Sequence, residues 1–212
     1  MPEKHSAYFE LIEALQSPDC AICRRVKDKV NSYFKNLLDE NINDVQFRRK
    51  LREEGGFCSP HAYQFLHLND ALATAIVQRD LLQSRVERFQ EKRAGGTGQA
   101  VCPVCAFALE IEKRCYGLII DYLSDRELIN VLMKSKGFCF PHFEGLAQCS
   151  AQLPGWLTDF QIERCRDLIQ ALDRFIESQN VASGEKPLRL SKADEESWER
   201  AIAMFYGYEG KP

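Results

Sequence analysis

Long apolar runs are missing from this sequence of 212 residues. The best apolar pieces, such as residues 117–120, are far shorter than the ~20 residues that cross a bilayer. No apolar core follows residues 1–5, so no secretory signal is visible. We therefore predict no membrane segment, and the default location that we expect is the cytoplasm.

An excess of positive charge is also missing. The sequence contains 28 Lys and Arg and 31 Asp and Glu, which gives a net charge of −3. Proteins that wrap phosphate backbones are usually basic, so this balance disfavours nucleic acid as a partner. Strand formers are scarce as well: Val and Thr together number 12, whereas Leu and Ala together number 40. This composition predicts an all-α protein.

Signatures of common enzyme classes are absent from the sequence. It has no P-loop, no dinucleotide-binding glycine pattern and no Ser/His/Asp set. We therefore predict no catalytic residues, and the sequence favours a role other than catalysis.

What the chain does contain is an internal duplication of roughly 80 residues. The motif Cys-x-x-Cys occurs at 20–23 and 102–105, and Gly-Phe-Cys-x-Pro-His occurs at 56–61 and 137–142. The copies are offset by 82 and 81 residues. We predict two pseudo-equivalent helical repeats packed together, plus a C-terminal helix. The predicted parts are repeat 1 over residues 1–93, a glycine-rich linker over 94–100, repeat 2 over 101–179, and a linker with the C-terminal helix over 180–212.

Helix start signals punctuate both repeats. Asp19 is a candidate cap for a helix that runs to about residue 40, Asp44 is a candidate cap in the first repeat, and Ser124 begins a capping box in the second. Long apolar periodicities predict helices over about 70–92 and 158–178. A last helix is predicted from Ser191, with Trp198, Ile202 and Phe205 on one side.

One difference between the repeats predicts a local irregularity. Cys58 follows Cys23 by 35 residues, whereas Cys139 follows Cys105 by 34. The extra residue must be absorbed, and we expect this between residues 38 and 44.

Each repeat offers three Cys and one His, which is a donor set for tetrahedral zinc. Glycine permits a tight turn before the second motif. Proline places the following His in the first turn of a new helix and the preceding Cys just outside it. We predict one metal site in each repeat. The first has the ligands Cys20, Cys23, Cys58 and His61, and the second has Cys102, Cys105, Cys139 and His142.

Thiolate and imidazole donors favour structural zinc, two ions per chain, and leave iron–sulfur clusters as the alternative. Buried free thiols and disulfides are competing interpretations, but neither explains why His and Pro recur at fixed positions. A c-type haem is excluded, because no His follows Cys23 or Cys105.

Some chemically interesting residues remain outside these sites. Cys115, Cys149 and Cys165 have no repeat partner, and the favoured interpretation is core packing rather than redox chemistry. Basic residues cluster around Arg24 and Arg48. A solvated helix face is the favoured interpretation of that cluster, and a phosphate site is the alternative.

The tandem Cys-x-x-Cys and Gly-Phe-Cys-x-Pro-His motifs resemble those of an uncharacterised family of bacterial and archaeal cytoplasmic proteins. The segment over 196–207 also resembles the ending of that family, so the resemblance covers about 17–208. It implies a metal-binding helical protein and carries no activity with it.

The function predicted from the sequence is a metal-binding helical module that binds a protein partner, not yet identified, or acts as a scaffold. Homo-oligomers are compatible with this function. The alternative is a redox protein, either an iron–sulfur electron carrier or a zinc–thiolate sensor.

Overall fold

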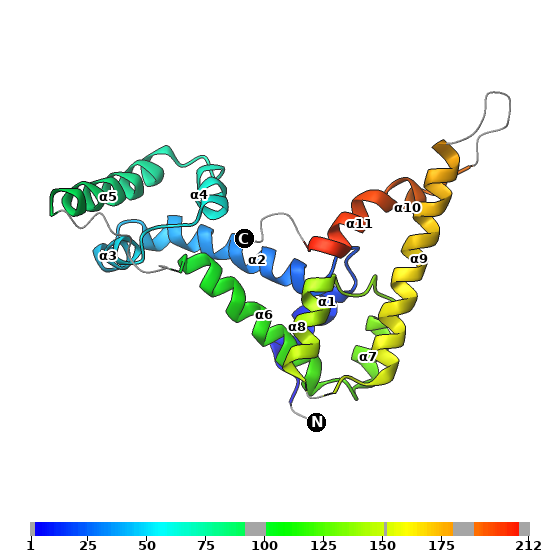
Figure 1. The fold of residues 1–212 in the computed structure, drawn as a ribbon. Helices are drawn as coiled ribbons and strands as arrows, with labels where there is room; N and C mark the ends of the chain where they lie inside the picture. Colours follow the sequence, from blue (N-terminus) through cyan, green and yellow to red (C-terminus); the bar gives the residue numbers. More distant parts are fainter. Residues whose placement is uncertain (1–2, 92–100, 151, 180–188, 208–212) are drawn as a thin grey trace. The chain divides into compact units, whose positions relative to one another are not determined.

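The computed structural model describes residues 3–91, 101–150, 152–179 and 189–207. Within these ranges the chain forms helices and no strand, which confirms the all-α prediction (Figure 1). The scarcity of β-branched residues explains this outcome. None of the described helices is both long enough and apolar enough to span a membrane.

The described chain forms two compact units. The first contains the chain up to Arg25 and the chain from Glu112 onward, and the second runs from Val26 to Ile111. Both unit boundaries lie inside long helices, namely α2 (Ala21–Asn36) and α6 (Pro103–Asp121). These boundaries differ from those of the predicted repeats, and the predicted linker over 94–100 lies outside the described residues.

The first unit contains six complete helices of the described chain and parts of two others. Besides parts of α2 and α6 it contains α1 (Ser6–Leu15), α7 (Arg126–Leu132), α8 (Phe140–Cys149), α9 (Gly155–Gln179), α10 (Lys192–Glu195) and α11 (Ser197–Tyr206). α1 packs against α7, and α11 packs against both α8 and α9. Its core includes the fully buried side chains of Tyr8, Leu128, Phe138 and Phe160.

The second unit contains α3 (Val45–Glu53), α4 (Ser59–Leu66) and α5 (Ala71–Gln90), together with parts of α2 and α6. α5 packs against α3 and α4. Phe34, Phe57 and Phe65 form an aromatic core, with ring centroids 5.6–6.0 Å apart.

The predicted irregularity in repeat 1 is confirmed as a π-helical turn. α2 continues directly into this turn, η1 (Leu37–Asn41). A π turn accommodates one residue more than an α turn within a continuous helix. The extra residue between Cys23 and Cys58 is therefore absorbed without breaking the helix.

One of the three predicted caps, Asp44, is confirmed. The side chains of Asp44, Asp70 and Asp125 each accept a hydrogen bond from a backbone N–H in the first turn of α3, α5 and α7. The cap of α7 is thus Asp125 and not Ser124. The backbone carbonyl of Cys20, not Asp19, accepts the first hydrogen bond of α2, from the N–H of Arg24 at 3.0 Å. The predicted last helix is interrupted at Glu196, so it forms α10 and α11.

Candidate metal centres

The second motif of each repeat builds a sharp entry into a helix. Gly56 and Gly137 have φ angles of +90° and +81°, which glycine adopts without steric cost. Cys58 and Cys139 are the extended residues before α4 and α8, and a proline occupies the first turn of each helix. This geometry turns the cysteine back toward the histidine three residues later.

The first motif of each repeat places its two thiols at another helix start. Cys20 lies directly before α2 and Cys102 directly before α6, and both carbonyls accept the first hydrogen bond of their helix. Cys23 and Cys105 follow one turn later, so each thiol pair shares one helix face.

The eight predicted ligands gather in two groups of three Cys and one His. Cluster 1 contains Cys20, Cys23, Cys139 and His142, and cluster 2 contains Cys58, His61, Cys102 and Cys105. Within each cluster the four candidate ligand atoms all lie within 4.8 Å of one another. Either cluster could hold a metal ion.

The predicted pairing of the ligands within each repeat is wrong. Each cluster combines Cys-x-x-Cys from one repeat with Cys-x-Pro-His from the other. Helix geometry gives the reason. His61 packs against Phe34 of α2, with ring centroids 6.3 Å apart. Phe34 lies three turns beyond Cys23, which is about 16 Å along a helix axis.

The same arrangement recurs at His142. Its ring packs against Tyr116 of α6, also with centroids 6.3 Å apart. Tyr116 lies three turns beyond Cys105. Each long helix therefore supplies thiols to one cluster at its start and an aromatic contact to the histidine of the other cluster further along.

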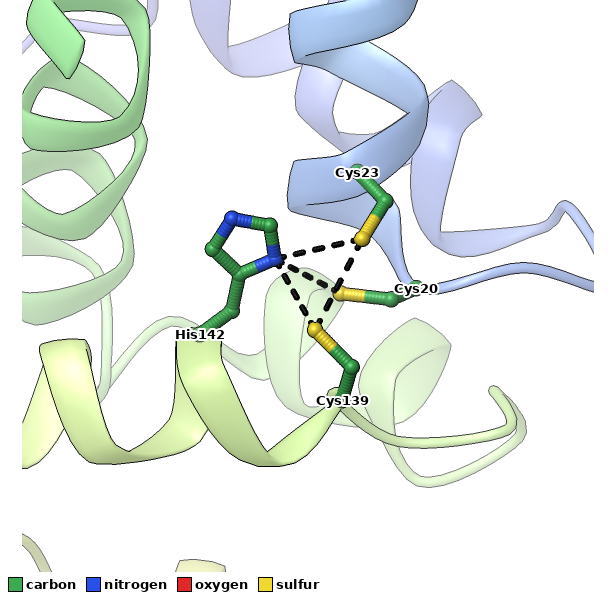
Figure 2. Close-up of side chains that lie close together, drawn as sticks. All are labelled: Cys20, Cys23, Cys139 and His142. Atoms are coloured by element: carbon green, nitrogen blue, oxygen red, sulfur yellow. Dashed lines mark hydrogen bonds between the residues drawn. The ribbon is translucent and has the colours of Figure 1, made fainter. Parts of the chain in front are cut away.

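Interatomic distances in both clusters suit a single tetrahedral ion. Zinc bonds of about 2.3 Å to sulfur and 2.0–2.1 Å to nitrogen imply about 3.8 Å between sulfurs and 3.6 Å from sulfur to nitrogen. In cluster 1 the Cys23 and Cys139 sulfurs are 3.6 Å apart, and His142 Nδ1 lies 3.1–3.5 Å from the three sulfurs (Figure 2). In cluster 2 the Cys58 and Cys105 sulfurs are 3.5 Å apart, and His61 Nδ1 lies 3.1–3.6 Å from its sulfurs.

Electrostatics within the clusters also favours a cation. Burial raises the pKa of Cys20, but hydrogen bonds with Cys139, Cys23 and His142 outweigh burial and lower this pKa well below its ordinary value. Hydrogen bonds with Cys139 and Cys20, together with burial, raise the pKa of Cys23. Sulfurs this close cannot all ionise unless a positive charge compensates them.

Cluster 2 shows the same opposition between two thiols. Burial raises the pKa of Cys102, but hydrogen bonds from His61 and from backbone N–H groups lower it to about 6. Burial and the neighbouring Cys58 and Cys102 raise the pKa of Cys105. A metal ion that binds thiolates would supply the missing positive charge.

Two contacts of cluster 1 involve residues that the sequence analysis did not select. Glu112 Oε1 of α6 lies 3.3 Å from His142 Nε2, on the side of the imidazole away from the sulfurs. The backbone of Gly207 passes so close that a Cβ atom there would lie 3.6 Å from the Cys23 sulfur. Glu112 lies one turn before Tyr116, so both residues that contact His142 from α6 share one face of that helix.

The remaining cysteines stay outside both clusters. Cys115 is buried, as core packing requires, and burial raises its pKa to about 11. Cys149 is exposed, so the core interpretation is wrong for this residue, and Cys165 is half-buried. All nine cysteines lie in the described part of the chain, and none of them forms a disulfide.

The basic residues singled out in the sequence have acidic neighbours. Arg25 forms an ion pair with Glu10, and an Arg48 nitrogen lies 3.6 Å from an Asp80 oxygen. These pairs fit a charge-balanced helix face better than a phosphate site.

Comparison with known proteins supports the resemblance seen in the sequence. Residues 3–93 match the model of a family of unknown function (DUF6062). No curated protein and no solved structure matches the chain. The matched segment contains the thiol pair of cluster 1 and the Cys–His pair of cluster 2, so it contributes half of each cluster.

Proposed function

We propose that this protein is a helical scaffold that two zinc ions stabilise, one in cluster 1 and one in cluster 2, and that it acts by binding a protein partner. The observation that carries the proposal is the presence of two groups of three thiols and one imidazole, each with the spacing of a single tetrahedral ion.

The size of the clusters supports zinc over an iron–sulfur cluster. A polynuclear cluster places iron and sulfide atoms between its protein ligands, which holds these ligands further apart than a single ion does. The candidate ligand atoms of each group lie within 4.8 Å of one another, which leaves room for one ion. Thiolate and imidazole donors suit zinc among the single ions.

The number of donors supports a structural role. Catalytic zinc keeps three protein ligands and an open position for water or substrate, whereas structural zinc has four protein ligands. Both groups offer four. With every position filled by the protein, zinc has no site at which to activate a water molecule.

Each ion would connect helix starts that are distant in the sequence. Cluster 1 joins the start of α2 to that of α8, and its nearest ligands in sequence, Cys23 and Cys139, are 116 residues apart. Cluster 2 joins the start of α4 to that of α6, with 41 residues between His61 and Cys102. Holding such loops closed requires a contribution that offsets the lost chain entropy, and metal bonds supply it.

An apolar face on α11 supports the partner-binding part of the proposal. Trp198, Ile202 and Phe205 repeat at helical spacing, and each is more than half exposed. Exposed aromatic side chains grouped in this way are typical of protein interaction sites. In a test of partner binding with substitutions on this face, Ile162 of α9 is the matched control position, because it is an exposed apolar residue outside the face.

Anaerobic purification without chelator, followed by elemental analysis and an absorption spectrum, tests the metal. We expect a colourless protein with two zinc ions per chain. A brown protein with broad absorption near ~400 nm would instead support the iron–sulfur alternative. Protein without any metal would refute both.

A further inference from the structure

The two clusters have the same donors but different surroundings. On the assumption that both bind zinc as proposed above, we infer that cluster 1 retains its ion while cluster 2 exchanges its ion readily. Cluster 1 would then be the permanent structural centre. Cluster 2 would be the metal-responsive centre, whose occupancy follows the free zinc concentration.

The first difference concerns the ring nitrogen that faces away from the sulfurs. In cluster 1 His142 Nε2 lies 3.3 Å from the carboxylate of Glu112, whose side chain is 10% exposed. A carboxylate in this position fixes the tautomer and orientation of the ring and raises the basicity of the ligating nitrogen. In cluster 2 His61 Nε2 is buried and has no hydrogen-bond partner in the described part of the chain.

The sequence explains why this support is one-sided. Tyr116 and Phe34 make equivalent contacts with the two histidines and are separated by the 82 residues that relate the helix starts. Glu112 lies four residues before Tyr116, and the matching position before Phe34 is Val30. Valine is apolar and cannot accept a hydrogen bond, so the repeat with Val30 lacks the carboxylate.

The second difference is access to the sulfurs. Cys23 and Cys139 of cluster 1 are 3% and 2% exposed, so Cys20 is the one half-exposed thiol there. In cluster 2 both Cys58 and Cys105 are half-exposed. A chelator must contact the ion or displace a ligand, and two partly exposed cysteines offer it more routes than one.

The third difference is a cover from the end of the chain. Gly207, directly after α11, places its backbone beside the Cys23 and Cys139 sulfurs. Its φ of +80° is a glycine conformation, and a side chain here would meet both sulfurs at about van der Waals distance. α11 belongs to the segment that has no counterpart in repeat 1, so this contact is an addition to cluster 1.

The experiment follows zinc release from the full-length zinc-loaded protein into an excess of a chromogenic chelator. We expect two phases of one ion per chain each. Cys58→Ser should abolish the fast phase, and Cys139→Ser should abolish the slow phase. Release of both ions at one rate, or the opposite assignment of the phases, would overturn the inference.

A second set of variants tests the role of Glu112 as a positioning residue. Glu112→Val should accelerate the slow phase by about 10- to 100-fold and leave the fast phase unchanged. Glu112→Gln retains an oxygen acceptor and should restore most of the retention. Glu110→Val, an exposed position on the same helix, is the matched control and should change neither phase. A slow phase that is unaffected by Glu112→Val would refute the positioning role.

These outcomes separate the inference from the proposed function. If neither cluster bound zinc, the purified protein would contain none and no release would be observed. Two bound ions with equal release rates would leave the zinc scaffold intact and refute only the difference between the clusters.

Discussion

Double substitutions distinguish the exchanged ligand pairing from pairing within each repeat. Cys20 and Cys139 belong to one cluster, whereas Cys20 and Cys58 belong to different clusters. The double variant Cys20→Ser/Cys139→Ser should therefore retain one ion per chain. The double variant Cys20→Ser/Cys58→Ser should retain none. Pairing within repeats predicts the reverse result.

Losing the ion of cluster 1 and losing the ion of cluster 2 should differ in their effect on the stability of the protein. The shortest loop that the metal closes spans 116 residues in cluster 1 and 41 in cluster 2. Loop-closure entropy grows with the logarithm of loop length. Closing the longer loop therefore costs about 0.9 kcal/mol more in chain entropy than closing the shorter one, and the ion of cluster 1 offsets this larger cost. Removing the ion of cluster 1 should therefore destabilise the protein more, by a further ~2–4 °C in Tm for a chain of this size.

Cys20→Ser and Cys58→Ser form a matched pair for this comparison. Both residues are half-exposed, and both directly precede a helix. Elemental analysis after gel filtration gives the ions per chain, and calorimetry gives Tm. Cys149→Ser, at an exposed thiol outside the clusters, is the control and should keep both ions. One ion retained by Cys20→Ser/Cys58→Ser would refute the exchanged pairing.

Four further predictions follow from the structure. Removing zinc with a chelator should lower Tm but preserve most of the helical circular dichroism, because α5 and α9 span 20 and 25 residues and bury apolar side chains such as Val77 and Phe160. A random-coil spectrum of the apo protein would contradict this. Cys115→Ala should leave two ions bound. Because it creates a small cavity at a buried site, it should lower the free energy of unfolding in urea by about 1 kcal/mol. Gly137→Ala should lower the free energy of unfolding by at least about 1 kcal/mol, because φ is +81° and the new Cβ would lie 2.9 Å from Gln161 Oε1. Gly117→Ala, in the open middle of α6, should raise the free energy of unfolding by about 0.5–1 kcal/mol. The Arg174 guanidinium and the Ser191 cap lower the pKa of Asp194 to about 2, so this carboxylate contributes stability that is complete above about pH 4 and lost as the pH falls through 2. The difference in urea midpoint between the wild type and Asp194→Asn should shrink over that range. A constant difference would contradict the ion pair.

Several features of the fold could be predicted because they depend on residues close in sequence. Asp44 caps the helix that follows it, since its carboxylate accepts a hydrogen bond from an N–H group two residues away. One extra residue between two motifs predicted a local irregularity between residues 38 and 44, and the π-helical turn at residues 37–41 overlaps this range. Local spacing also identified the eight candidate ligands, because glycine, proline and the Cys-x-x-Cys period restrict the backbone near each donor.

Other features were beyond the reach of local patterns. Glu112 was missed because a single glutamate on a helix does not reveal which histidine will pack beside it. The exposure of Cys149 was predicted wrongly for a similar reason: a cysteine near a helix end is buried only if another element covers it.

The sequence by itself determined the helical class of the protein and which eight residues offer thiolate and imidazole donors. It could not determine their pairing, because either pairing gives two sets of three Cys and one His. The tertiary structure decided this. The contacts of His61 with Phe34 and of His142 with Tyr116 place each histidine three helical turns away from the thiols of its own repeat. Whether a residue can bind a metal depends on its own side chain, whereas the other ligands of the same ion depend on which helices pack together.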